Sequence, residues 1–177
     1  MRKVFLIVAV AALAGCNSQT KTEGNKDEVQ VKAATSLPYV PSYSASFKMG
    51  NPEYSAMILK GSWKDWENNT MDNMKSWVAD TIVAFHSDNS MIKGADSLVA
   101  RWKTGRAKYS SVIDSIDAVI PVYSTDKDEN WVLVWATEIN TKIDGTKDTA
   151  AVMETWRINK DGKADMLLQY DRAKRKQ

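Results

Sequence analysis

The stretch WVLVWATEI, residues 131–139, decides how the sheet of this chain must be covered. Side chains alternate between the two faces of a β-strand, and here both alternating sets begin apolar. The two sets are Trp131, Leu133 and Trp135 on one face and Val132, Val134 and Ala136 on the other. A strand that is apolar on both faces needs cover on both. Helices can cover one face, so the other face predicts a homodimer partner or an overhanging segment.

Segments on both sides of this stretch extend it into an antiparallel sheet. Residues 111–125 alternate partly between apolar and polar and are rich in Val and Ile, a composition typical of strands. Asp-Gly turns in IDGT and NKDGK then separate two further apolar runs, TAAVMETWRI and ADMLLQYDRA. Neither turn continues to the glutamate that an EF-hand calcium loop requires. The chain from residue 110 onward therefore predicts a meander of four antiparallel strands.

Three helices are expected before the meander. The first begins at residues 51–53 (Asn-Pro-Glu), which supply a cap, a proline at the first helical position and a carboxylate in the first turn. Its apolar residues recur at helical spacing and are Ala56, Leu59, Trp63 and Trp66. A short second helix follows a break at residues 68–69 and carries Met71, Met74 and Trp77. The third is ADSLVARWKTG, residues 95–105.

A β-hairpin is expected between the second and third helices. Residues 81–86 are rich in β-branched side chains and predict a strand. The polar turn SDNS then reverses the chain into a short strand at residues 91–93. His86, the only histidine of the 177 residues, therefore lies at the end of a strand, just before a turn.

Four segments carry a resemblance to a known superfamily: VADTIVAFHS, MIKGADSLVARW, WVLVWA and ETWRINKDGKADMLLQY. Their order and spacing resemble the nuclear transport factor 2-like superfamily, and in particular its small SnoaL-like members. The resemblance implies an α+β, cone-shaped fold in which three helices pack on a curved, mostly antiparallel sheet around an internal pocket. It also implies that two chains can pair through the outer face of the sheet. We expect this domain to span residues 51–177.

The N-terminus has the parts of a bacterial lipoprotein signal in the required order. Arg2 and Lys3 supply positive charge, and the apolar run at residues 4–14 is too short to span a bilayer, which needs about 20 residues. The run ends in LAGC, which resembles a lipobox in which the chain is cut before Cys16 and the thiol receives a lipid. Residues 1–15 are therefore expected to be a signal peptide.

Cys16 is the sole cysteine, which excludes an internal disulfide and a thiolate metal cluster. The polar residues 17–32 lack periodicity, a pattern typical of a flexible segment. We therefore expect residues 16–50 to form the lipidated cysteine and a tether. Because two or more acyl chains give stable anchoring, the expected location is a membrane of the bacterial cell envelope, with the outer membrane facing the periplasm preferred.

The charge balance argues against a nucleic-acid partner. The chain carries 24 Lys and Arg against 22 Asp and Glu, and loss of Arg2 and Lys3 with the signal peptide would make the two counts equal. Nucleic-acid binding is indicated by a concentrated basic surface. The basic run RAKRK, residues 172–176, is expected to be a solvated terminus.

Three roles are open for His86: a polar residue at a strand end, a pocket-lining group or a catalytic base. In ketosteroid isomerases, which share the fold implied by the resemblance, a catalytic aspartate follows the Ala-Asp pair of the first strand, and that position falls on His86. Their oxyanion tyrosine falls on Ser62, so a main electrostatic contributor to that reaction is missing. No metal or other cofactor is expected, because no second histidine or thiolate can share the coordination.

Tryptophans and carboxylates supply the remaining candidates. Ligand pockets are typically aromatic with few polar groups, and a carboxyl that faces into such a pocket would have a raised pKa. The expected pocket residues are Trp63, Asp80, His86, Trp102, Trp135 and Trp156. The carboxylates in predicted sheet regions are Asp80, Asp117, Glu138, Glu154 and Asp171.

These features favour a membrane-tethered domain that binds a small apolar or ring-containing ligand or acts as an accessory protein. One alternative is an isomerase, dehydratase or cyclase that uses His86 with a pocket carboxylate. The other alternative is a structural envelope protein that assembles through its sheet face.

Overall fold

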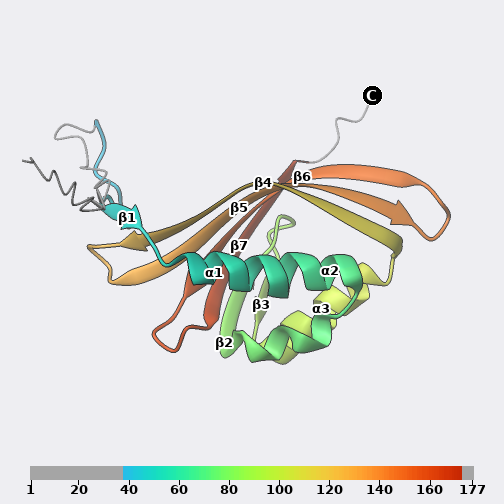
Figure 1. Cartoon of the computed structure of the whole chain (residues 1–177), viewed down its shortest axis with the longest axis horizontal. Coiled ribbons are helices and arrows are strands. Elements are labelled where there is room, and N and C mark those ends of the chain that lie inside the picture. The colour runs from blue at the N-terminus through green and yellow to red at the C-terminus, as the bar shows by residue number, and fades with distance from the viewer. Residues whose placement is uncertain (1–37, 173–177) are drawn as a thin grey trace, which may run out of the picture.

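A computed structural model describes residues 38–172, and within this range the strands form one sheet of seven. The strands are β1 (Phe47–Met49), β2 (Val78–Phe85), β3 (Met91–Lys93), β4 (Tyr109–Ser124), β5 (Glu129–Lys142), β6 (Lys147–Ile158) and β7 (Ala164–Arg172). Their order in the sheet is β1-β4-β5-β6-β7-β2-β3, and β2 with β7 is the parallel pair among antiparallel ones. Figure 1 shows the curved sheet above the helices. The expected α+β fold with a curved, mostly antiparallel sheet is confirmed.

The first predicted helix is continuous from Pro52 to Asn68 but contains a π-helical segment. Its parts are α1 (Pro52–Ile58), η1 (Leu59–Lys64) and α2 (Asp65–Asn68), which form one rod in Figure 1. The Asn51 side chain caps it by accepting a hydrogen bond from the Glu53 N–H at 3.0 Å. Asn69, with φ 60°, ends it in the left-handed region. The predicted cap and break are therefore confirmed.

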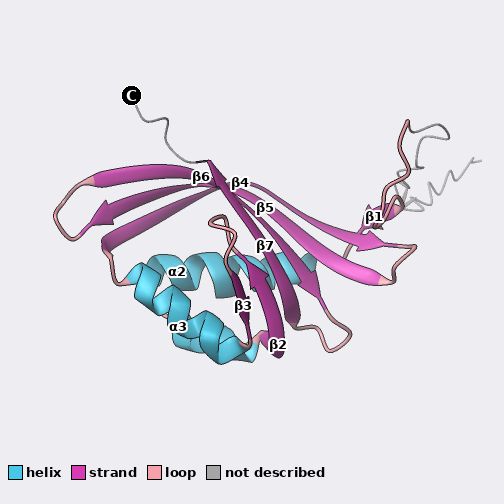
Figure 2. Cartoon of the chain, turned by 180° about the vertical axis from the view of Figure 1, so that it is seen from behind, coloured by secondary structure: helices cyan, strands magenta, loops and turns pink. Residues whose placement is uncertain are grey.

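Two further helical segments complete the helical layer. The 3-10 helix η2 (Met71–Ser76) follows the break, and α3 (Ala95–Arg106) follows the β2–β3 hairpin. Gly61 lets the first helix approach the residue after η2, because an added Cβ at Gly61 would lie 2.4 Å from Nε1 of Trp77. Figure 2 shows α2 and α3 together on one side of the sheet, with the β2–β3 hairpin beside β7.

The meander of β4 to β7 matches the sequence expectation, but the place of β2 does not follow from local pattern. β2 begins at Val78, earlier than the predicted residue 81, and pairs in parallel with β7. The register of this pair shifts between Val78 and Val83. This pairing brings the end of β2, where His86 lies, next to β7.

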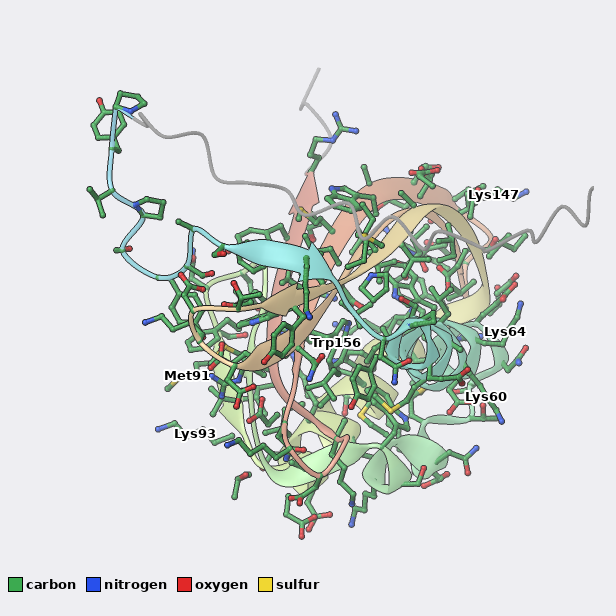
Figure 3. All side chains as sticks on the ribbon, turned by 60° about the vertical axis from the view of Figure 1, so that its left-hand side comes forward. Lys60, Lys64, Met91, Lys93, Lys147 and Trp156 are labelled. Carbon is green, nitrogen blue, oxygen red and sulfur yellow. The ribbon has the colours of Figure 1, made fainter. Side chains whose placement is uncertain are left out.

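The core lies between the helices and the inner face of the sheet. On β5 the side chains of Val132, Val134 and Ala136 are buried there. Trp156 on β6 is fully buried, and its ring meets those of Trp77 and Trp102 edge-on at 5.3 and 6.1 Å. Figure 3 labels Trp156 in the middle of the molecule and Lys60 and Lys64 at its periphery.

The outer face of the sheet is covered at one end by an overhanging segment, which is one of the two forms of cover expected. The Tyr43 ring packs edge-on against Trp131, with their centroids 6.0 Å apart. β1 then adds an edge strand beside β4. The described fold thus extends N-terminal to Asn51, the residue at which the sequence places the start of the domain.

The predicted signal peptide, Cys16 and most of the tether lie outside the described residues. Within residues 38–172, no helix has the length and apolar character needed to cross a bilayer.

Candidate functional site

A cavity of about 360 Å³ lies between the helices and the inner face of the sheet. The first helix contributes Ser62, Trp63 and Trp66, and α3 contributes Trp102. The sheet contributes polar side chains, which are Glu138 and Asn140 on β5, Glu154 on β6, and Gln169 and Asp171 on β7. The cavity is therefore aromatic on the helical side and polar on the sheet side.

The structure brings together some of the expected pocket residues and separates others. Trp63, His86 and Trp102 line the cavity. Trp156 lies in the core next to it, where its indole donates to the cavity residue Glu154. Trp135 belongs to the outer set of β5, beside Met153. Asp80 is exposed in the part of β2 where the register shifts, so neither Trp135 nor Asp80 lines the cavity.

Of the five candidate carboxylates, three line the cavity and two do not. Glu138, Glu154 and Asp171 face it. Asp117 is exposed and accepts a hydrogen bond from Thr137 at 3.3 Å. Asp80 is also exposed and lies outside the cavity.

Glu154 is the most deeply buried acidic residue described, with 3% of its surface exposed. Oε2 accepts hydrogen bonds from Trp156 Nε1 at 2.9 Å and Ser62 Oγ at 3.3 Å, and Oε1 accepts from Gln169 Nε2 at 3.0 Å. Burial raises the pKa of Glu154 from 4.5 to about 7, although these three donors act in the opposite direction. The group can therefore exist in either protonation state near neutral pH.

His86 is connected to Glu154 through Gln169. His86 Nδ1 lies 3.0 Å from Gln169 Oε1, while the amide nitrogen of the same residue donates to Glu154. Because Gln169 presents its carbonyl oxygen to His86, Nδ1 must carry the proton. The neutral ring then has its lone pair on Nε2, which is buried without a hydrogen-bond partner in the described chain. His86, a residue of the cavity lining, therefore has a buried acceptor without a partner in the described chain.

Glu138 and Asn140 form a second polar cluster on β5. Glu138 accepts hydrogen bonds from Trp66 Nε1 at 2.6 Å and from Asn140 Nδ2 at 2.5 Å. Burial raises the pKa of Glu138, and the two donors partly oppose that effect. Since the carboxylate can only accept, Asn140 must direct its amide nitrogen to Glu138. Its Oδ1 is buried and has no partner among the described residues.

Sequence reasoning missed Asn140, Asp114 and Arg106. Asp114 lies opposite Glu138 in the β4–β5 register, and burial raises its pKa to about 7. The Arg106 guanidinium is buried and donates to backbone carbonyls of Trp66, Glu67 and Tyr109, so it joins α2 to α3 and β4. An inward position on an alternating strand was the available signal for Asn140 and Asp114. Arg106 gave none, because a basic residue in the last turn of a helix is ordinary.

Within residues 38–172, no group of three or more His, Cys, Asp or Glu side chains is placed to hold a metal ion. Three polar atoms of residues in the cavity lining are buried without a hydrogen-bond partner among the described residues, and these are His86 Nε2, Asn140 Oδ1 and Trp63 Nε1.

We expect Glu154→Gln to change how stability depends on pH. The folded-state pKa of about 7 lies above the ordinary 4.5, so the stabilising effect of the protonated carboxyl is complete below about pH 4.5 and is lost as the pH rises through 7. One pKa unit corresponds to about 1.4 kcal/mol. The variant should therefore gain up to about 3 kcal/mol in free energy of unfolding over the wild type between about pH 4.5 and 8.

Urea unfolding at a series of pH values measures this difference. Glu53→Gln, at the exposed start of α1, is the control for the substitution itself. A difference between Glu154→Gln and the wild type that stays constant over this pH range would contradict the assignment.

Solved structures of other proteins share this architecture. A protein of Shewanella denitrificans OS-217, whose name describes a SnoaL-like polyketide cyclase, matches with a TM-score of 0.57 and 9% identity over 69% of this chain and 92% of its own. A protein of unknown function from Exiguobacterium sp. 255-15, described as nuclear transport factor 2-like, matches with a TM-score of 0.55 and 15% identity over 66% of this chain and 99% of its own.

A third similar structure contains a ligand. It is a Mycobacterium tuberculosis protein in complex with estradiol-17beta-hemisuccinate, with a TM-score of 0.53 and 16% identity over 66% of this chain and 92% of its own. No family model and no curated protein matches the chain. The similarity extends across most of each of these proteins. At sequence identities of 9–16%, it shows a shared fold. The chain has the nuclear transport factor 2-like fold that its sequence resembles.

Proposed function

We propose that this domain binds a small ring-containing ligand in the cavity between the helices and the inner face of the sheet. The observation that carries the proposal is His86 Nε2, a buried acceptor without a partner, in the lining of a cavity walled by Trp63, Trp66 and Trp102. A ligand that donates a hydrogen bond to this nitrogen would satisfy it. Small-molecule sites combine aromatic side chains with polar groups that orient the ligand.

A solved structure of the same fold supports a ring-containing ligand. The Mycobacterium tuberculosis protein described above was crystallised with estradiol-17beta-hemisuccinate, a ligand built on fused rings. The cavity of the present chain, about 360 Å³, lies within the range of small-molecule pockets.

Binding fits the geometry better than either alternative function. An isomerase of the type considered would need a donor for a substrate oxygen where Ser62 lies, but the Ser62 hydroxyl donates to Glu154. A purely structural role gives no reason for unpaired polar atoms in a cavity wall, since each such atom costs about 1–3 kcal/mol.

We further propose that two chains pair through the outer face of the sheet. Large apolar side chains are exposed across this face, among them Phe85 on β2, Met91 on β3, Ile120 on β4 and Tyr170 on β7. The overhanging Tyr43 covers only the end at Trp131. A second copy offers the same apolar surface, so that one two-fold axis would cover both.

The N-terminal motif supports a proposed membrane tether. Cys16 and the apolar run before it lie outside the described residues, and the proposal rests on the order of charge, apolar run and LAGC in the sequence. A lipid on Cys16 would hold the cavity-bearing domain at a membrane of the cell envelope, with the outer membrane facing the periplasm as the preferred site.

Ala150→Trp should block the cavity. Ala150 lies in its wall on β6, whereas the next residue, Ala151, faces the other side of the strand and is a matched control. Calorimetry with 2-naphthol, a neutral ring with a hydroxyl donor, should show binding to the wild type and to Ala151→Trp. Ala150→Trp should bind at least about tenfold more weakly, a loss of about 1.4 kcal/mol. Equal affinities of the two variants would exclude this cavity as the site.

Ile120→Lys should convert a dimer to a monomer, because it places a charge in the proposed apolar interface. Ile120 is 37% exposed, so the folded monomer should tolerate the change. Ile143→Lys is the control, since Ile143 is 75% exposed in the β5–β6 turn and lies outside the face. Sedimentation equilibrium should give dimers for the wild type and this control. A monomeric wild type at high concentration would contradict the pairing.

Mass spectrometry of the mature chain tests the tether. We expect the chain to begin at Cys16 and to carry the mass of a diacylglyceryl group, and Cys16→Ser should abolish both the cleavage and the membrane fraction. An unmodified Cys16 in the membrane fraction would contradict the lipid anchor.

A further inference from the structure

The cavity lining is richer in acidic than in basic side chains. The acidic residues are Asp88, Glu138, Asp148, Glu154 and Asp171, and the basic ones are Arg101 and Lys108. Arg101 is already paired with Asp88, with Nη2 3.0 Å from Oδ2, and Lys108 is exposed. The cavity therefore presents a surplus of negative charge to a bound molecule.

The two carboxylates of the sheet wall, Glu138 and Glu154, lack a counter-ion. Neither takes part in an ion pair of the described chain. Both are held by neutral donors, which for Glu138 are the Trp66 indole and the Asn140 amide. The nearby Arg106 attracts Glu138 electrostatically, but its hydrogen bonds go to backbone carbonyls. A buried carboxylate without a paired charge is costly, and a cation that reached it would offset this cost.

An unpaired acceptor next to Glu138 shows where such a cation would bind. Asn140 is 5% exposed, lines the cavity, and has a buried Oδ1 without a partner in the described chain. Because Nδ2 is engaged by Glu138, this oxygen can be satisfied only by an N–H or O–H donor from elsewhere. A carboxylate and a carbonyl oxygen side by side match an ammonium group, which has several N–H donors and no acceptor.

Aromatic side chains lie close to this acceptor pair. Trp66, whose indole donates to Glu138, packs edge-on against Trp102 with ring centroids 6.0 Å apart, and both line the cavity. Tyr109 also lines it. Organic cations bind favourably where aromatic rings and carboxylates meet, because the ring faces are electrostatically negative and the rings exclude water.

We propose that the ligand is an organic monocation with a ring, whose protonated nitrogen binds at Glu138 and Asn140 while the ring lies against the tryptophans. The inference rests on the proposed binding function and narrows its ligand class. It makes the sheet wall the charged end of the site and the helical wall the apolar end. It also supplies a donor for Asn140 Oδ1, which has no partner among the described residues.

Three probes that share one ring and differ in charge test the proposal on the full-length chain. They are phenethylammonium, 2-phenylethanol and phenylacetate, titrated by calorimetry at about pH 8, well above the ordinary pKa of a glutamate carboxyl, which is about 4.3. We expect phenethylammonium to bind at least about tenfold more tightly than the alcohol, and phenylacetate to bind most weakly. The alcohol binding as tightly as the ammonium, or phenylacetate binding most tightly, would overturn the proposal.

The same Glu-to-Gln substitution at each of the two carboxylates tests which of them binds the cation. Glu138→Gln should reduce the affinity for phenethylammonium to that for the alcohol and leave the affinity for the alcohol within about twofold. Glu154→Gln, at the other carboxylate, should keep most of the preference for the ammonium. The opposite pattern would overturn the placement at Glu138. Should Glu138→Gln fail to fold, the comparison of the three probes on the wild type decides the question alone.

The same experiment separates this inference from the function on which it rests. Binding of the alcohol that Ala150→Trp abolishes, without any advantage for the ammonium, would refute the cationic ligand and leave the binding cavity in place. Absence of binding by all three probes would refute both.

Discussion

Burial of the Glu154 carboxyl on the inner face of the sheet is the constraint on which the site depends. A carboxyl at this depth must find hydrogen-bond donors, because a buried polar group without a partner is costly. Its donors come from three elements: Ser62 on the first helix, Trp156 on β6 and Gln169 on β7. Gln169 in turn orients His86 at the end of β2. One buried group thus sets the position of a helix, the orientation of a core tryptophan and the tautomer of the histidine.

The cavity itself follows from a mismatch in length between the layers. β5 has 14 residues, which at about 3.3 Å per residue gives roughly 46 Å of strand. Residues 52–68 rise only about 25 Å as a helix, and Figure 1 shows the β5–β6 hairpin extending beyond α2. The helices therefore cannot cover the full inner face. The side chains change accordingly along β5, from Val132 and Val134 in the covered part to Glu138 and Asn140 near its end.

Periodicity was enough to predict the elements, because helices and strands repeat at different intervals and their caps and turns have local signals. It could not decide which face of β5 meets the helices, since both faces begin apolar. Trp135 was for this reason expected in the pocket, although it lies on the outer face, whereas Trp63 and Trp102, which lie on helices, line the cavity. Asp80 lies outside the cavity for a different reason. The register shift in β2 changes which side chains face the core in that part of the strand.

The contacts that make the site chemically specific join residues far apart in the chain. Trp66 reaches Glu138 across 72 residues, and His86 reaches Gln169 across 83. No local pattern encodes such a pair. The role of Asn140 is a consequence of the first contact, since the position of the Glu138 carboxylate determines which way the amide must point. The sequence can therefore predict that Glu138 faces inward, but only the tertiary structure shows that Asn140 Oδ1 is an unpaired acceptor beside it.

The two faces of β5 each lack something different: the outer face lacks apolar cover, and the inner face lacks a counter-ion for its carboxyls. On the outer face, exposed apolar side chains need cover, which any large complementary surface could supply and which a second copy of the chain would supply by symmetry. On the inner face the conflict is electrostatic, since apolar side chains at positions 138 and 154 would fill the interior at lower cost than two carboxyls without a counter-ion. Local conflicts of this kind concentrate where a protein binds or reacts. A small cation would resolve the inner conflict, whereas a protein surface would not fit into a cavity of about 360 Å³.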